Sequence, residues 1–174
     1  RVFLIDDHRS ILWGLERLID SGKPAMQVVG SAANCTEAFK LIEGAAPDVI
    51  LLDIDLGKEN GIDGIPKLMS LSPAKILVLT GLRDKSVHDE AVLAGASGVV
   101  EKESPAETIL TAIVKVHDGQ IWLDRVSTGR VFVEFSREGA AHAADPERVK
   151  IASLTYRERE LVAVTTSNAG ATAK

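Results

Sequence analysis

The sequence has little of several features that mark special classes of protein. It contains one cysteine, Cys35, so no disulfide can form within the chain, and a reducing cytoplasm is the simplest compartment for it. No charged-then-apolar leader opens the chain. No apolar run approaches the ~20 residues that a membrane-spanning helix needs. We therefore expect a cytoplasmic protein that does not work in or on a membrane.

An excess of positive charge is also missing. The chain has 20 lysines and arginines against 25 aspartates and glutamates, for a net charge of −5. This balance argues against attraction of the whole surface to nucleic acid, although it leaves room for a local basic face. With 174 residues, 45% of them hydrophobic and 26% charged, the composition is typical of a globular protein. The length allows one full domain and part of a second.

Five short apolar runs alternate with segments of helical periodicity along the first 124 residues. The runs are VFLI, MQVVGSA, VILLD, AKILVLT and GVVEK. This alternation predicts an α/β fold with a doubly wound, five-stranded parallel sheet of the flavodoxin-like order 2-1-3-4-5. Between the third and fourth runs we interpret GKENGIDG as a glycine-punctuated loop. Before the fifth run we interpret LAGASG as a helix end followed by a tight turn into the strand.

The composition and the apolar pattern of the sequence change after Asp124. Residues 125–153 are interpreted as a linker that contains one short apolar segment. In LTYRERELV, Thr155 is followed three residues later by Glu158, which is the capping-box pattern that opens a helix. We therefore predict a domain over 1–124, a linker over 125–153, and the start of an all-α domain over 154–174.

Polar residues interrupt the ends of four of the predicted strands. Asp6 and Asp7 follow the first run, Asp53 ends the third, Thr80 ends the fourth and Lys102 ends the fifth. Any one of them could be a capping or solvated residue. In the predicted order these four strands are neighbours, and ligands of open α/β sheets bind beyond the carboxyl ends of the strands. The five side chains together therefore indicate a site.

The chemistry of these five residues is consistent with phosphoryl transfer. Three packed carboxylates repel one another unless a cation lies among them, and a set of oxygen ligands suits Mg²⁺. A carboxylate can attack phosphorus to form an aspartyl phosphate. A lysine and a metal would neutralise the phosphoryl oxygens, and a threonine hydroxyl would donate a hydrogen bond to them.

The motifs IDDH, LLDIDLGKENG, VLTG and VVEKESP resemble the receiver domain of bacterial two-component response regulators over about residues 1–124. The resemblance implies that Asp53 accepts phosphate from a phosphohistidine on a sensor histidine kinase. It implies that Thr80 and Lys102 bind and sense the phosphoryl group, in a switch rather than an enzyme with turnover. The implied Mg²⁺ ligands are the carboxylates of Asp6, Asp7 and Asp53 and the backbone carbonyl of Asp55.

The segments DGQIWLD and LTYRERELV look like the NarL/FixJ branch of this family. Its output is a LuxR-type helix-turn-helix that binds DNA, and its members often form homodimers when phosphorylated. The resemblance to this output covers only about residues 154–174, whereas base reading requires the second helix of the motif. We therefore expect DNA binding of the full-length protein but not of these 174 residues.

A second family uses almost the same chemistry. Phosphatases of the haloacid dehalogenase type carry Asp-x-Asp at a strand end, followed by a threonine and a lysine on later strands. In that alternative Asp53 would be the nucleophile and Asp55 the general acid and base. The resemblance is weaker because those enzymes need a further acidic pair, for which only Asp118 and Asp124 are candidates, and because Asp6 and Asp7 would have no role.

Two positions depart from the usual receiver pattern. Where most receivers have a tyrosine or phenylalanine three residues before the lysine, this sequence has Val99. The position four after Asp53 is often proline but here is Gly57, which should loosen its loop. Among the histidines, His8 is interpreted as a solvated loop residue because Mg²⁺ prefers oxygen. His88 carries no functional prediction.

Overall fold

The computed structural model describes residues 1–82 and 84–123. The strands are β1 (Val2–Ile5), β2 (Val28–Ala32), β3 (Val49–Leu52), β4 (Asp55–Leu56), β5 (Glu59–Asn60), β6 (Lys75–Thr80) and β7 (Gly98–Glu101). The helices are α1 (Arg9–Asp20), α2 (Cys35–Ala45), α3 (Gly61–Leu71), α4 (Lys85–Leu93) and α5 (Ala106–His117). None of these helices is long and apolar enough to cross a membrane. The predicted linker and the predicted start of an all-α domain lie outside the described residues.

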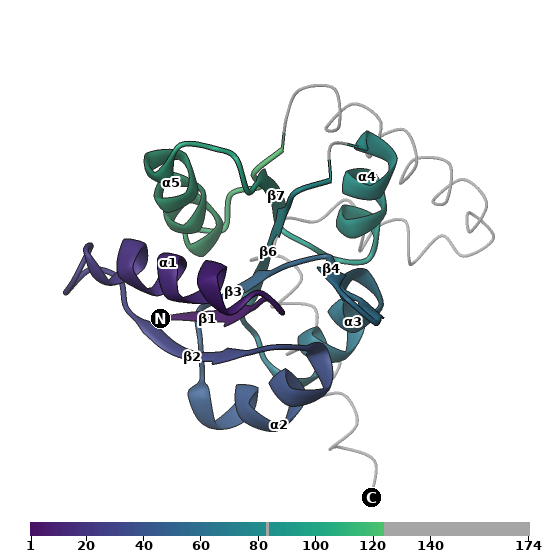
Figure 1. The fold of residues 1–174 in the computed structure, drawn as a ribbon, viewed down its shortest axis with the longest axis horizontal. Helices are drawn as coiled ribbons and strands as arrows, with labels where there is room; N and C mark the ends of the chain where they lie inside the picture. The colour runs from purple at the N-terminus through teal and green to yellow at the C-terminus, as the bar shows by residue number, and fades with distance from the viewer. Residues whose placement is uncertain (83, 124–174) are drawn as a thin grey trace, which may run out of the picture. The chain divides into compact units, whose positions relative to one another are not determined.

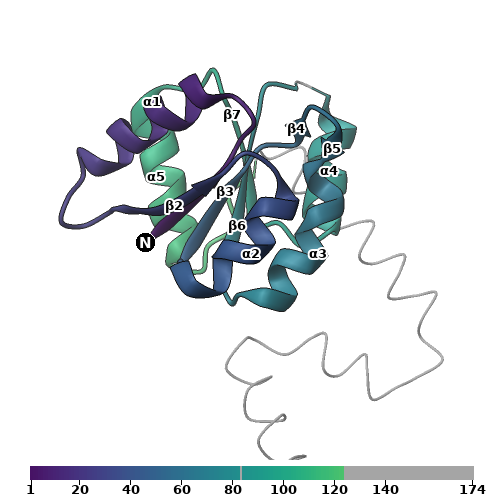
Figure 2. The same ribbon diagram turned by 60° about the horizontal axis from the view of Figure 1, so that its bottom comes forward.

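The main sheet has five parallel strands in the order β2-β1-β3-β6-β7, as predicted. Figures 1 and 2 show α1 and α5 on one face of this sheet and α2, α3 and α4 on the other. The strand register pairs Ile5 with Leu52 and Leu52 with Val78, so the central strands end at nearly the same level. The residues that follow these strands therefore emerge at one edge.

Successive strand residues enter two different cores because side chains alternate between the faces of a strand. Phe3 and Ile5 of β1 pack with Ile50 and Leu52 of β3 against α2, α3 and α4. Val2, Leu4, Val49 and Leu51 pack against α1 and α5. All eight residues of β1 and β3 are buried, which explains the unbroken apolar runs. This double burial holds the ends of β1 and β3 in place.

The segment predicted as a loop after β3 instead forms a hairpin and the first turn of a helix. Residues 55–60 form a small antiparallel hairpin, β4 with β5, and α3 begins at Gly61, so the loop prediction over GKENGIDG was wrong. The hairpin turn includes Gly57 at φ +71°, a conformation that glycine adopts without strain. The Asn60 side chain then accepts a hydrogen bond from Ile62 N at 3.0 Å and caps α3.

Gly61 is needed for the close packing of this hairpin against β3. A Cβ atom at position 61 would lie 2.2 Å from the Asp53 carbonyl oxygen, a distance that real Cβ contacts do not show. The amide of Gly61 also donates to the carbonyl of Ile54 at 2.7 Å. The backbone immediately after Asp53 is therefore pinned by a glycine eight positions later.

Cys35 begins α2 and is buried, with 4% of its surface exposed. Its sulfur packs closely against Gly64 of α3, where an added Cβ would come within 2.5 Å of Sγ. Burial, together with the nearby charges of Glu59 and Asp63, raises the pKa of the thiol to about 11. The thiol is a structural contact between two helices.

After α5 the chain returns to the outer edge of β7. The amide of Trp122 donates to the Ser97 carbonyl at 3.0 Å, and the amide of Val99 donates to the Trp122 carbonyl at 3.0 Å. Trp122 also packs partly buried against the core shared by α1 and α5. This contact partly covers the exposed edge of the sheet, and it places Trp122 close to Val99.

Candidate functional site

Asp6 and Asp53 stand side by side at the carboxyl ends of the two central strands. Asp6 directly follows β1 and Asp53 directly follows β3, and the amide of Asp53 donates to the Ile5 carbonyl at 2.9 Å. Only 2% of Asp6 and 3% of Asp53 are exposed. Charged residues are rarely buried so fully without a partner, so both carboxylates require a nearby cation or donor.

Lys102, which follows β7, supplies such a cation. Its Nζ lies 2.6 Å from Asp53 Oδ2 and 2.6 Å from Asp6 Oδ2. The contact with Asp53 is a hydrogen bond. The contact with Asp6 is an ion pair of the same length, whose angles are not those of a hydrogen bond. One ammonium group therefore serves two buried carboxylates.

Burial and the neighbouring charges shift the pKa values of Asp53 and Lys102. Burial raises the pKa of Asp53, and the opposing effect of Lys102 does not cancel it, partly because the Asp6 charge also repels. For Lys102, burial acts to lower the pKa, but Asp53 and Asp6 together outweigh it and the pKa is raised. The cluster thus favours a protonated lysine and would gain from additional positive charge near Asp53.

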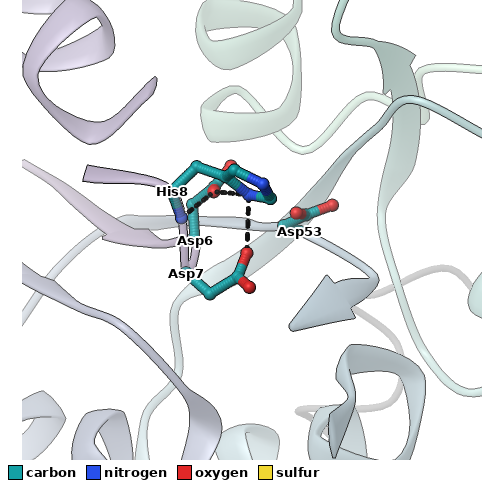
Figure 3. A group of neighbouring side chains, drawn as sticks. All are labelled: Asp6, Asp7, His8 and Asp53. Carbon is teal, nitrogen blue, oxygen red and sulfur yellow. Dashed lines mark hydrogen bonds and ion pairs between the residues drawn. The ribbon is translucent and has the colours of Figure 1, made fainter. Parts of the chain in front are cut away.

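Four side chains converge on this position, as Figure 3 shows. They are Asp6, Asp7, His8 and Asp53, and each offers a ligand atom within 4.8 Å of all the others. His8 Nδ1 lies 2.7 Å from Asp7 Oδ1 and 3.4 Å from Asp6 Oδ1. The three carboxylates fit a hard divalent cation, which binds oxygen ligands. The structure therefore brings the predicted acids together, and it adds a histidine that the sequence reading had set aside.

Asp55 contributes to the site through its backbone. Its amide lies 3.3 Å from Asp53 Oδ1 and donates to it, while its own side chain is exposed and lies outside the carboxylate cluster. This arrangement agrees with a role for the main chain of Asp55 rather than its carboxylate. The predicted metal contact through the Asp55 carbonyl stays a prediction.

Thr80 is fully buried at the end of β6. Its carbonyl accepts a hydrogen bond from the Lys102 amide at 2.8 Å, and its hydroxyl accepts one from the Leu82 amide at 3.0 Å. Thr80 is therefore connected both to the lysine of the site and to the segment that leads into α4. This position suits a residue that senses a group bound at Asp53.

His88 is a residue that the sequence reading missed. It lies in α4, only 4% exposed, and its Nε2 donates to the Leu82 carbonyl at 2.8 Å. It also lines a cavity of about 280 Å³ together with Val99 and Trp122. No spacing in the sequence marks a lone histidine as buried, so only the fold reveals that His88 connects the segment after Thr80 to α4.

Glu59 is a second residue that sequence reasoning missed. From the hairpin after Asp53 its carboxylate accepts hydrogen bonds from Cys35 N and from Thr36 Oγ1, each at 3.0 Å. A carboxylate at a helix N-terminus satisfies free amides and interacts favourably with the helix dipole. The hairpin is thus fastened to α2 through Glu59, and the looser loop expected from Gly57 stays a prediction.

Comparison with known proteins places this geometry in a family. Residues 2–114 match the response regulator receiver domain. The chain belongs to this family. It is 34% identical over 163 residues to the DNA-binding transcriptional activator DevR/DosR of Mycobacterium tuberculosis, covering 93% of this chain and 72% of that protein.

Solved structures agree with this assignment. A LuxR-family two-component response regulator from Aurantimonas superposes with a TM-score of 0.68 at 29% identity, over 78% of this chain and 97% of that one. A response regulator from Burkholderia pseudomallei, solved with a phosphorylated aspartic acid, calcium ion and citrate, gives a TM-score of 0.60 at 29% identity, over 79% and 73% of the chains. These findings support a two-component response regulator and not the phosphatase alternative.

Proposed function

We propose that this response regulator is switched by phosphorylation of Asp53. The observation that carries the proposal is the position of the Asp53 carboxylate, which is almost fully buried at the end of a central strand and hydrogen-bonded to Lys102 Nζ at 2.6 Å. The related protein from Burkholderia, with its phosphorylated aspartic acid and calcium ion, gives independent support.

In the proposed reaction a carboxylate oxygen of Asp53 attacks the phosphorus of a phosphohistidine on a sensor histidine kinase. A carboxylate O–P bond forms as the N–P bond breaks, and the bond's electron pair stays on the histidine nitrogen of the kinase. The Lys102 ammonium, already beside the attacking carboxylate, stabilises the negative phosphoryl oxygens. Burial raises the pKa of Asp53, and added positive charge would lower it and favour the reactive carboxylate form.

Asp6, Asp7 and Asp53 would hold the divalent cation, and we propose that Mg²⁺ is its usual identity. Asp55 is proposed to add its backbone carbonyl. When bound, the ion would neutralise phosphoryl oxygens during transfer. The fit rests on three carboxylates that converge within 4.8 Å and on Lys102, one ammonium that faces two of them.

Thr80 is proposed to report the phosphoryl group to α4. Its hydroxyl can donate to a phosphoryl oxygen while it accepts from the Leu82 amide. Any shift of Thr80 would move Leu82, whose carbonyl is bonded to His88 of α4. This series of contacts offers a route from the site to a helix surface in a chain that has Val99 at the usual aromatic position.

The test is phosphorylation of the purified chain by acetyl phosphate and Mg²⁺, followed by intact-mass and peptide mass spectrometry. We expect one phosphoryl group on the peptide that contains Asp53 and none on Asp53→Asn. The matched control is Asp55→Asn, which changes a nearby exposed aspartate and should still be phosphorylated. A wild-type chain that gains no phosphate, or an Asp53→Asn chain that gains it on the same peptide, would overturn the proposal.

The output is proposed to be regulation of transcription through DNA, with phosphorylation promoting a homodimer. The support for the DNA output comes from the relatives, one of which is named as a DNA-binding transcriptional activator. The homodimer is carried over from the resemblance to the NarL/FixJ branch. The residues expected to contact DNA lie outside the described residues. Genomic DNA selection with the full-length phosphorylated regulator, combined with sedimentation analysis, would test both parts. Recovery of no enriched DNA sites would contradict the DNA-binding output.

A further inference from the structure

His8 places a nitrogen donor directly at the proposed metal site. Its Nδ1 is 2.7 Å from Asp7 Oδ1 and 3.4 Å from Asp6 Oδ1, and it belongs to the same group of ligand atoms as Asp53 (Figure 3). A divalent ion bound among these atoms would have Nδ1 within reach as a ligand. The imidazole is therefore in the first layer of groups around the site.

The backbone of His8 holds the ring in this position, and the ring itself does not cap helix α1. Its amide donates to Asp6 Oδ1 at 2.8 Å, and the residue is the N-cap of α1 in an extended conformation, without a side-chain capping bond. The side chain is 60% exposed, so a small rotation can bring Nδ1 onto an ion without disturbing the core.

The charge of the cluster indicates that it can take a cation. Lys102 Nζ lies 2.6 Å from both Asp6 Oδ2 and Asp53 Oδ2, so one ammonium faces two buried carboxylates, and Asp7 adds a third carboxylate. Packed carboxylates repel one another unless positive charge lies among them. These carboxylates and the His8 nitrogen are two different kinds of donor that belong to one site.

The chemistry of the donor set decides which ions it favours. Mg²⁺ binds oxygen ligands and retains water, so it gains little from an imidazole. First-row transition ions bind imidazole well, and their affinity for a given site rises from Mn²⁺ through Co²⁺ to Cu²⁺. Replacing one water by a ring nitrogen therefore favours a transition ion over Mg²⁺.

We propose that His8 is a ligand of this site and that it makes the receiver bind a divalent transition ion more tightly than carboxylates alone would. The inference rests on the metal site of the proposed function and names an additional ligand for it. It makes the metal that accompanies phosphorylation depend on the supply of transition ions as well as Mg²⁺.

The test measures Mg²⁺ and Co²⁺ binding separately, by calorimetry on the full chain and by the visible absorption of bound Co²⁺. His8→Ala should lose about tenfold in Co²⁺ affinity, an effect of the size seen when groups that support metal ligands are removed. Its Mg²⁺ affinity should change by less than about twofold, because Mg²⁺ prefers oxygen. The Co²⁺ spectrum should also shift as the nitrogen donor is lost.

His117→Ala is the matched control. His117 Nδ1 also lies beside an aspartate, Asp118 at 3.1 Å, and its side chain is 56% exposed, but it is outside the carboxylate cluster. This variant should bind both ions as the wild type does. Circular dichroism of both variants checks that the fold is kept.

Each remaining outcome has a distinct meaning. Equal losses of Mg²⁺ and Co²⁺ affinity in His8→Ala, or no loss of either, would overturn the assignment of His8 as a ligand. If the wild type still binds Mg²⁺ and is phosphorylated in those cases, the proposed function stands. A wild type that binds neither ion would overturn the metal site and His8 together.

Discussion

The two ends of the site are built in different ways. At the β1–β3 end, Asp6 and Asp53 directly follow paired, fully buried strands, so backbone hydrogen bonds and burial on both faces of the sheet fix the backbone at both residues. At the β6–β7 end, the connection to α4 runs through side chains, from the Thr80 hydroxyl to the backbone of Leu82 and then to His88. We call the β1–β3 end the chemical end and the β6–β7 end the signalling end. The comparison suggests that the chemical end tolerates little substitution, whereas the signalling end can be formed by different side chains.

The largest effect should follow from disturbing the backbone at the chemical end. Gly61→Ala would place a Cβ 2.2 Å from the Asp53 carbonyl oxygen, so we expect the free energy of unfolding to fall by about 3 kcal/mol or more. Gly44→Ala, in α2, is the control, because a Cβ there meets nothing within 4 Å among the described residues. It should stabilise the fold by up to about 1 kcal/mol. Urea denaturation measures both, and equal effects would show that this end is not tightly fixed.

Removal of single carboxylates should separate side-chain ligands from backbone ligands. We expect Asp7→Asn to weaken Mg²⁺ binding by about tenfold or more, because Asp7 offers its carboxylate to the cluster. Asp55→Asn should weaken it by less than about threefold, because only its carbonyl is proposed to bind the ion. Calorimetric titration with Mg²⁺ gives both values. Similar losses in the two variants would remove the distinction between these aspartates.

At the signalling end, His88→Leu should uncouple α4 with little loss of stability. The exposed position of Leu82 allows water to replace the lost donor, so the free energy of unfolding should change by no more than about 1 kcal/mol. We expect the change in hydrogen exchange of α4 on addition of beryllofluoride, a phosphoryl mimic, to disappear. His88→Gln, which keeps a donor for the Leu82 carbonyl, should retain part of it. An unchanged response in His88→Leu would exclude the histidine from the route.

The smallest expected effect comes from restoring an aromatic ring at position 99. Val99 lines a cavity of about 280 Å³ with His88 and Trp122, so Val99→Tyr should be accommodated at a cost of at most about 1.5 kcal/mol. We expect it to enlarge the response of α4 and β7 in the same exchange experiment. If the wild type already shows an exchange response confined to residues 85–102 and as large as that of Val99→Tyr, the idea that Val99 limits the response of α4 and β7 would be contradicted.

The sequence predicted the chemical end well because its determinants are local. An unbroken apolar run followed by an acid predicts both a buried central strand and the place of Asp53, and the observed sheet order brings Asp6 and Lys102 to the same edge. Other features depend on contacts between distant segments. The bond from His88 to Leu82 and the fastening of Glu59 to Cys35 leave no periodic pattern in the chain.

The hairpin after Asp53 was misread for a related reason. Glycines at 57 and 61 look like signals for a loop, yet each serves a tight contact, one through its positive φ and the other through its missing Cβ. His8 was set aside on the preference of Mg²⁺ for oxygen, and that argument says nothing about where the ring lies. Composition predicts the type of residue in a site better than it predicts the direction of a side chain.

The buried thiol of Cys35 makes this protein suitable for spectroscopic labelling. It is the one cysteine in the sequence, its sulfur is packed against Gly64, and its pKa of about 11 leaves almost no thiolate near neutral pH. Maleimide and nitroxide reagents should therefore leave the wild-type chain unmodified. Lys40→Cys in α2 and Glu90→Cys in α4, both at exposed positions, would then carry a pair of spin labels with no background. Distances between the two labels, measured before and after phosphorylation, would show how far α4 moves relative to α2.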